Sequence, residues 1–179
     1  LYVQSKSFDE IYEMAKNKSE MLSCIPAIMP VKGTDIYRIS SYYGQRTDPF
    51  YKVTKFHGGI DFSGPVGLGI YATGDGVVKK VEKNKSGYGN NILIDHGYGY
   101  MTRYAHLHSF KVKKGQKVKR GQEIGTMGNT GKSTAPHLHY EVIKNNKTVN
   151  PINFFYNDLT PEEYDKILEL SQHPSQTMD

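Results

Sequence analysis

The chain has 179 residues, a formal net charge of +5 and a hydrophobic fraction of 37%. This length suits one domain with short flanks rather than two independent cores. No apolar run approaches the roughly 18 residues that a membrane span needs, and no charged start precedes an apolar segment as in a signal peptide. Because the first residue is Leu1 rather than Met, we expect a trimmed fragment, with any membrane anchor or export signal lying upstream.

The composition favours short strands joined by tight turns, because 18 residues are Gly and 14 are Tyr. The single Cys24 excludes an internal disulfide framework and a zinc site built from several thiolates. The basic segment Lys111–Arg120 suits an anionic polymer, such as nucleic acid, anionic lipid or cell wall. Its lysines alternate with apolar residues and lack stacked aromatics, so we favour solvated strand edges and expect no nucleic-acid partner.

Residues 1–35 are predicted to form an N-terminal helix and a connector. The helix is expected over Ser7 to about Ser23, where Ser7 and Glu10 fit a capping box. Apolar side chains recur there at helical spacing: Phe8, Ile11, Tyr12, Ala15 and Leu22. Two prolines, Pro26 and Pro30, then predict an extended connector.

Residues 36–156 are predicted to form one mainly β domain, an antiparallel sheet or sandwich with a substrate groove. Apolar residues alternate with polar ones in short runs that Gly-rich turns separate every 8–12 residues or so. The clearest strands are Gly76–Lys83, Asn91–Asp95, Tyr100–Ala105, Glu123–Met127 and His137–Ile143. No Gly-rich phosphate loop opens a helix, which argues against nucleotide-binding folds.

Residues 157–179 are predicted to form a C-terminal helix and a frayed tail. Thr160 fits the N-cap, Pro161 the first helical position, and Glu163 the partner of Thr160 in a capping box. Tyr164, Ile167 and Leu168 are expected to face one side.

Five chemistry-bearing residues stand in two short motifs and at one strand end. His57-Gly-Gly-Ile-Asp61 reads as a turn that runs into a strand, and His137-Leu-His139 puts two imidazoles on one strand face. His106 ends the strand before Leu107. Two histidines and one carboxylate meet the needs of a catalytic zinc, and spacing alone leaves His137 and His139 equivalent. The remaining histidines are read as background: His96, His108 and His173.

With these motifs the sequence resembles the lysostaphin-type (LytM-like) zinc metalloendopeptidases, which cut the peptide part of bacterial peptidoglycan. The resemblance runs from about Ile39 to Pro151 and rests on the following segments: SSYYGQRTDPF (Ser40–Phe50), KFHGGIDFSGPVG (Lys55–Gly67), ATGDGVV (Ala72–Val78), YAHL (Tyr104–Leu107), VKKGQKVKRGQEIG (Val112–Gly125), GNTGKSTAPHLHYEV (Gly128–Val142) and NP (Asn150–Pro151). The order of the two His motifs, with YAHL between them, makes the signature specific.

The resemblance implies a role for each of the five residues. His57, Asp61 and His139 would bind one zinc ion per chain, so the family pattern selects His139 where spacing does not. His106 and His137 would be the catalytic pair that handles protons and stabilises the transition state, with the division of labour between them open.

Residues near these motifs are expected to have supporting roles or none in the chemistry. Tyr51 stands where some family members carry a Tyr that assists the oxyanion, although packing or exposure is the simpler interpretation. Arg46 and Asp48 are expected to brace each other, in preference to a substrate role. The polar residues before His137 are expected to shape a groove wall: Asn129, Thr130 and Ser133.

The implied activity is hydrolysis of peptide cross-links by an enzyme of the cell envelope, periplasmic or extracytoplasmic, whose partners are peptidoglycan peptides. The alternative is a catalytically inactive domain that binds peptidoglycan and activates an amidase. Such relatives typically lose a zinc ligand, whereas all five residues are present here. A zinc carboxypeptidase of the D-Ala-D-Ala type would need a longer His-to-Asp spacing. The sequence indicates neither the bond cleaved nor the oligomeric state.

The N-terminal helix has two possible places. We expect it to pack on the β domain away from the zinc, through Phe8, Ile11, Ala15 and Leu22. The alternative is a lid over the groove that donates a fourth ligand from one of several candidates: Asp9, Glu10, Glu13, Glu20 or Cys24. The acidic residues read more simply as charges that the helix dipole favours near an N-terminus.

Overall fold

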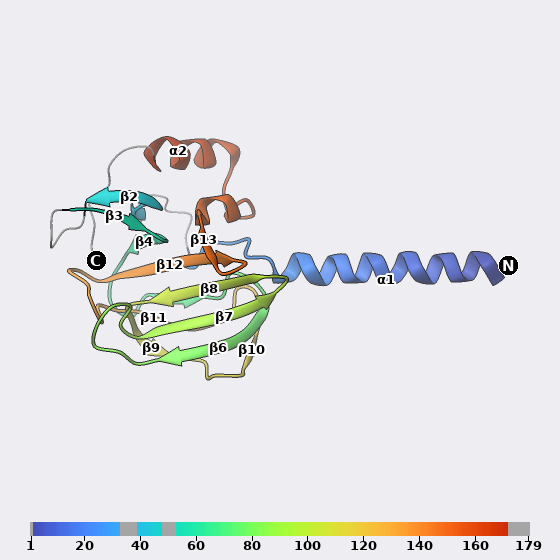
Figure 1. The fold of residues 1–179 in the computed structure, drawn as a ribbon, viewed down its shortest axis with the longest axis horizontal. Helices are drawn as coiled ribbons and strands as arrows, with labels where there is room; N and C mark the ends of the chain where they lie inside the picture. The colour runs from blue at the N-terminus through green and yellow to red at the C-terminus, as the bar shows by residue number, and fades with distance from the viewer. Residues whose placement is uncertain (1, 33–38, 48–52, 172–179) are drawn as a thin grey trace.

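The computed structural model describes residues 2–32, 39–47 and 53–171. Strands make up the body of the molecule, and a long N-terminal helix projects from it (Figure 1). The elements are α1 (Tyr2–Cys24), β1 (Ile39–Ser41), β2 (Gly44–Thr47), β3 (Thr54–His57), β4 (Ile60–Ser63), β5 (Gly69–Tyr71), β6 (Gly76–Glu82), β7 (Asn91–Gly97), β8 (Tyr100–Ala105), β9 (Leu107–Phe110), β10 (Lys117–Val118), β11 (Glu123–Met127), β12 (His137–Lys144), β13 (Lys147–Val149), η2 (Pro151–Phe154) and α2 (Pro161–Ser171). Among the described residues, neither helix has the length and apolarity to cross a membrane.

The strands form three antiparallel sheets. The largest has eight strands in the order β1-β4-β12-β8-β7-β6-β10, with β13 paired to β12. A three-stranded sheet, β5-β11-β9, shares a hydrophobic core with it, and β2 and β3 form a separate hairpin. The expected antiparallel β fold with a helix at each end is therefore confirmed.

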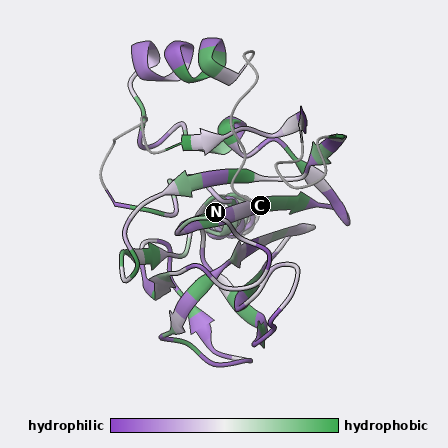
Figure 2. Ribbon diagram, turned by 90° about the vertical axis from the view of Figure 1, so that its left-hand side faces the viewer, coloured by the Kyte–Doolittle hydropathy of each residue, from purple (hydrophilic) through white to green (hydrophobic). Residues whose placement is uncertain are grey.

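Strand β12 crosses the centre of the large sheet and separates the core from the polar face. Leu138, Tyr140 and Val142 belong to the main hydrophobic cluster, together with side chains of β4, β7 and β11. The alternate residues His137 and His139 point to the other face, as the two-residue period predicts. Green (hydrophobic) and purple (hydrophilic) stretches both occur on the strands of the body (Figure 2).

The predicted strands match the structure to within about two residues at each end. β6, β7, β8, β11 and β12 are the five runs identified from alternation. The C-terminal capping box is also confirmed. Thr160 N donates to Glu163 Oε2 over 2.8 Å, and Glu163 N donates to Thr160 Oγ1 over 3.2 Å. Ile167 of α2 is fully buried against the domain.

The prediction for the N-terminal helix was wrong in two respects. Helix α1 begins at Tyr2, so Ser7 lies inside it and is not its N-cap. The helix also extends away from the β domain instead of packing on it (Figure 1), and Phe8, Ile11 and Leu22 are 72%, 59% and 48% exposed. Apolar spacing identifies one face of a helix but does not say what covers that face. The groove lies on the β domain, and no residue of α1 lines it. In this structure α1 is therefore not a lid over the groove.

The connector after α1, by contrast, is part of the domain. Met29 and Val31 are 4% exposed and join the core, and Tyr71 N of β5 donates to Pro30 O over 2.8 Å. Arg120 fixes the base of the helix, because its guanidinium donates to the carbonyls of Leu22, Ser23 and Ile25. The connector therefore contributes side chains to the core of the β domain.

Candidate metal centre

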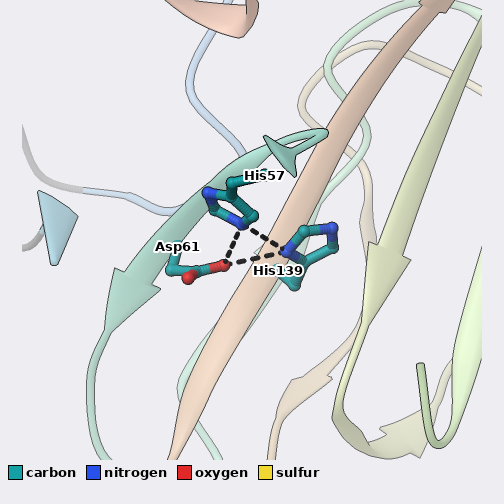
Figure 3. Close-up of side chains that lie close together, drawn as sticks. All are labelled: His57, Asp61 and His139. Carbon is teal, nitrogen blue, oxygen red and sulfur yellow. Dashed lines mark hydrogen bonds and ion pairs between the residues drawn. The ribbon is translucent and has the colours of Figure 1, made fainter. Parts of the chain in front are cut away.

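His57, Asp61 and His139 meet because of the way three strands are paired. Asp61 of β4 lies directly opposite His139 of β12 in the antiparallel register. His57 ends β3, and the Gly58-Gly59 turn brings it back over β4. All three side chains are buried, at 3% exposure or less, and they point toward one another (Figure 3).

The ligand atoms of these residues form a nearly equilateral triangle. His57 Nε2 lies 3.1 Å from Asp61 Oδ1 and 3.0 Å from His139 Nδ1, and His139 Nδ1 lies 2.9 Å from Asp61 Oδ1. In a tetrahedral site with bonds of about 2.0–2.1 Å to nitrogen and oxygen, two ligand atoms are about 3.3 Å apart. The triangle is therefore close in size to one face of such a site.

The outer nitrogen of each imidazole has a hydrogen-bond acceptor of its own. His57 Nδ1 lies 2.7 Å from the carbonyl oxygen of Tyr42, and His139 Nε2 lies 3.2 Å from Glu141 Oε1. In a neutral ring the proton sits on the nitrogen that faces the acceptor, so the other nitrogen presents its lone pair. Three electron-pair donors then face one point, an arrangement that suits a cation.

Protonation of the cluster follows the same logic. Burial raises the pKa of the Asp61 carboxyl, but the hydrogen bonds from His139 and His57 outweigh it and hold that pKa well below its usual range. For His139, burial lowers the pKa, but the hydrogen bonds to Asp61 and then Glu141 raise it to about 10. A proton on His139 therefore competes with a metal ion for Nδ1.

The second oxygen of Asp61 is also fixed. Arg46 Nη1 of β2 donates to Asp61 Oδ2 over 3.0 Å and to Ser41 Oγ over 2.7 Å. Arg46 thus fixes the orientation of the candidate ligand Asp61. The partner expected for Arg46 from the sequence was Asp48, which lies outside the described residues.

The segment between His57 and Asp61 needs glycine at position 59. A Cβ at Gly59 would lie 2.4 Å from the carbonyl oxygen of Tyr140, whereas one at Gly58 would come no closer than 3.4 Å to any atom. Only glycine therefore lets the turn between β3 and β4 lie against β12. This close approach brings His57 over the pair formed by Asp61 and His139.

His106 and His137 lie beside the triangle, with ring centroids 4.6 Å apart. His106 Nδ1 donates to Thr130 O over 2.7 Å, and His137 Nδ1 donates to Ala135 O over 2.8 Å. Both neutral rings therefore carry their lone pair on Nε2. His106 has φ = 60°, an uncommon left-handed conformation for a non-glycine residue and one typical of functional positions.

A cavity of about 250 Å³ opens over the triangle. The β2–β3 hairpin forms one wall, and the loops around Tyr88 and Lys132 form the other. The lining residues are Arg46, Lys55, Phe56, His57, Gly58, Gly87, Tyr88, His106, Lys132, His139 and Glu141. Two glycines, Gly58 and Gly87, are among these lining residues.

The structure brings together all five residues singled out from the sequence and adds others. Thr130 and Ser133, expected only to shape a wall, contact the rings of His106 and His137. His96, which is read as background from the sequence, lies in β7 and is 2% exposed. Tyr51 lies outside the described residues.

Glu141 and Tyr88 received no role from the sequence. Glu141 Oε1 accepts from Tyr88 Oη over 2.7 Å, and Glu141 Oε2 accepts from Arg103 Nε over 2.9 Å. Burial raises the pKa of Glu141, but His139, Tyr88 and Arg103 together hold it below its usual range. The sequence did contain a signal for Glu141: it follows His139 by two residues, so both side chains lie on one face of β12.

Residues 55–151 match the family model described as peptidase family M23. The peptidoglycan DD-endopeptidase ShyA of Vibrio cholerae is 50% identical over 115 residues, which cover 64% of this chain and 26% of ShyA. The chain spans about a quarter of the length of the first curated relatives it matches.

Solved structures agree with this match. A zinc-containing peptidase from Vibrio cholerae superposes with a TM-score of 0.63 and 42% identity, covering 70% of this chain and 39% of the other. The catalytic domain of lysostaphin from Staphylococcus simulans gives a TM-score of 0.58 and 33% identity, covering 64% and 88%. These similarities confirm the resemblance drawn from the sequence motifs.

Proposed function

Because the chain belongs to peptidase family M23, we propose that it is a zinc-dependent endopeptidase that hydrolyses peptide cross-links of bacterial peptidoglycan. The proposal extends the family assignment to a metal, a substrate and a set of residues. It places the activity in the cell envelope, because the substrate is found there.

The observation that carries the proposal is the triangle of His57 Nε2, Asp61 Oδ1 and His139 Nδ1. Three buried polar atoms, two imidazole nitrogens and one carboxylate oxygen, lie within 3.1 Å of one another. When both rings are neutral, each presents a lone pair to the same point, and this supports a cation site. Two imidazoles and one carboxylate are a donor set that zinc accepts, with a fourth position left open for chemistry. We assign one zinc ion per chain to these residues. The name of the zinc-containing relative from Vibrio cholerae supports this choice of metal.

A zinc ion at this site would act as a Lewis acid, acidifying water and polarising the scissile carbonyl. The chain's own residues supply the proton transfers. A neutral His106 or His137 accepts a proton at Nε2, because its Nδ1 already donates to a backbone carbonyl. The other ring, once protonated, donates from Nε2 to the developing oxyanion.

The groove suits a peptide that carries carboxylates. Lys55 and Lys132 line its two walls, and Arg46 lies at its floor beside Asp61. Stem peptides of peptidoglycan are anionic, so positive charge along the groove would favour their binding. The relative ShyA is named as a DD-endopeptidase, which favours cleavage of a D-Ala cross-link over a glycine bridge.

The chain carries all five residues to which we assign the chemistry, and this supports an enzyme over an inactive domain that activates an amidase. The test is digestion of purified cross-linked muropeptides, followed by mass spectrometry of the products. We expect dimers to be converted to monomers with the gain of one water, and chelator treatment to abolish the conversion. Intact dimers after incubation with the zinc-loaded protein would contradict the proposal, and the product masses would identify the bond.

A further inference from the structure

Glu141 occupies a position that the ligand set does not explain. It is 3% exposed, lies on the same face of β12 as His139, and has both carboxylate oxygens engaged. Oε1 contacts His139 Nε2 and Tyr88 Oη, while Oε2 accepts from Arg103 Nε. A buried carboxylate with this many partners has one fixed orientation.

The partners of Glu141 also hold one another. The guanidinium of Arg103 lies over the Tyr88 ring, 4.2 Å from its centroid, and the Tyr88 ring lies 5.7 Å from the ring of His139. Arg103 is the cross-strand neighbour of Glu141 on β8. Strand pairing therefore fixes Arg103, which orients Glu141, which in turn contacts His139.

We propose that Glu141, held by Arg103 and Tyr88, is a positioning residue that keeps His139 in the Nε2–H tautomer with Nδ1 directed at the metal triangle. This rests on the proposed zinc site. In the neutral ring, an Nε2 that donates to Glu141 leaves Nδ1 without a proton and able to ligate a cation. The carboxylate also makes the imidazole a more basic ligand. Glu141 itself would not ligate the ion, because its carboxylate contacts Nε2 of His139 and not Nδ1.

The inference is tested by the zinc affinity of the full chain, measured by competition with a chromophoric chelator. Glu141→Ala is expected to weaken zinc binding by about 10- to 100-fold, the usual effect of removing the hydrogen-bond partner of a histidine ligand. Glu141→Gln keeps an acceptor oxygen opposite Nε2 and is expected to recover most of this loss. The matched control is Glu82→Ala, which removes an exposed glutamate on β6 whose Oε1 lies 3.4 Å from Lys80 Nζ. This variant should bind zinc as the wild type does.

A second measurement separates positioning from folding. The visible spectrum of the Co²⁺-loaded protein reports ligand geometry, so Glu141→Ala should change its bands while Glu141→Gln leaves them close to wild type. Tyr88→Phe retains the ring and removes one hydrogen bond to Glu141, and it should weaken zinc binding less than Glu141→Ala does. If Glu141→Ala does not fold, Tyr88→Phe and Glu141→Gln decide the matter.

Two failures can be told apart. Wild-type protein that binds no zinc would overturn the proposed function. Wild-type protein that binds zinc, with Glu141→Ala binding it equally tightly and showing the same Co²⁺ spectrum, would overturn the role of Glu141 alone. Equal losses in Glu141→Ala and Glu141→Gln would also contradict it, because restoring the acceptor would then have had no effect.

Discussion

Asp61 and His139 face each other across the β4–β12 ladder, and Asp61 Oδ1 lies 2.9 Å from His139 Nδ1. The backbone register of two neighbouring strands therefore sets the distance between two candidate ligands. His57 completes the triangle from a third strand, and the position of His57 depends on the turn between β3 and β4. A strand pair of this kind is a rigid support for a metal site, since its geometry is fixed before any ion binds.

Substituting the two histidines of the His-x-His motif should affect zinc binding and activity differently. His139→Ala should lose both zinc and activity, because it removes a corner of the triangle. His137→Ala should lose activity and retain about one zinc per chain, because its Nδ1 donates to Ala135 O and its ring lies beside the triangle. Elemental analysis of both purified variants checks this. Equal loss of zinc in the two would mean that their roles are misassigned.

The turn between β3 and β4 should tolerate a side chain at one glycine and not at the next. Gly59→Ala places a Cβ 2.4 Å from Tyr140 O, so the turn must move away from β12 and carry His57 with it. We expect weaker zinc binding and a lower melting temperature. Gly58→Ala meets nothing closer than 3.4 Å and is the matched control. Calorimetry and zinc affinity of the two variants give the comparison, and identical behaviour would contradict this account of the turn.

Truncation should distinguish the helix from the connector. A variant without residues 1–20 keeps the carbonyls that Arg120 binds and should retain its activity and its stability. A variant without residues 1–32 also loses the core side chains of Met29 and Val31, whose burial stabilises the domain by a few kcal/mol. Urea unfolding and muropeptide digestion measure both. Higher activity in the shorter truncation would show that α1 restrains the site after all.

The sequence predicts the local features of this molecule well and the long-range ones poorly. Alternation is enough to identify β12 and the shared face of His137 and His139, and the Thr160–Glu163 capping box depends on residues only three apart. The contacts of Asp61 with Arg46 and of Glu141 with Arg103 depend on strand register, which one sequence does not reveal. The packing of α1 was mispredicted for a related reason, since the apolar spacing of a helix does not identify the surface that packs against it.

The buried His96 should make the stability of the metal-free protein depend on pH. Burial lowers the pKa of His96 below its usual value, although Asp75 O accepts a hydrogen bond from its Nδ1. The unfolded state then binds more protons than the folded state just below about pH 6.5, so the contribution of His96 is present above that pH and is lost as pH falls.

The measurement compares wild type with His96→Gln in the presence of a chelator, by urea unfolding from about pH 8 to about pH 5. The difference in unfolding free energy between the two proteins should shrink toward acid. Other titrating groups, including Asp61 and His139, are common to both proteins and largely cancel. A difference that stays constant over this range would show that His96 titrates alike in both states.

The most direct test of the central claim is a zinc titration of the metal-free protein, with bound zinc and cleavage of a purified cross-linked muropeptide dimer measured in the same samples. We predict that cleavage rises in proportion to bound zinc and stops rising at one equivalent per chain, and that Asp61→Ala shows neither binding nor cleavage. Cleavage that is independent of zinc, or an Asp61→Ala variant that binds zinc and cleaves as the wild type does, would contradict the account.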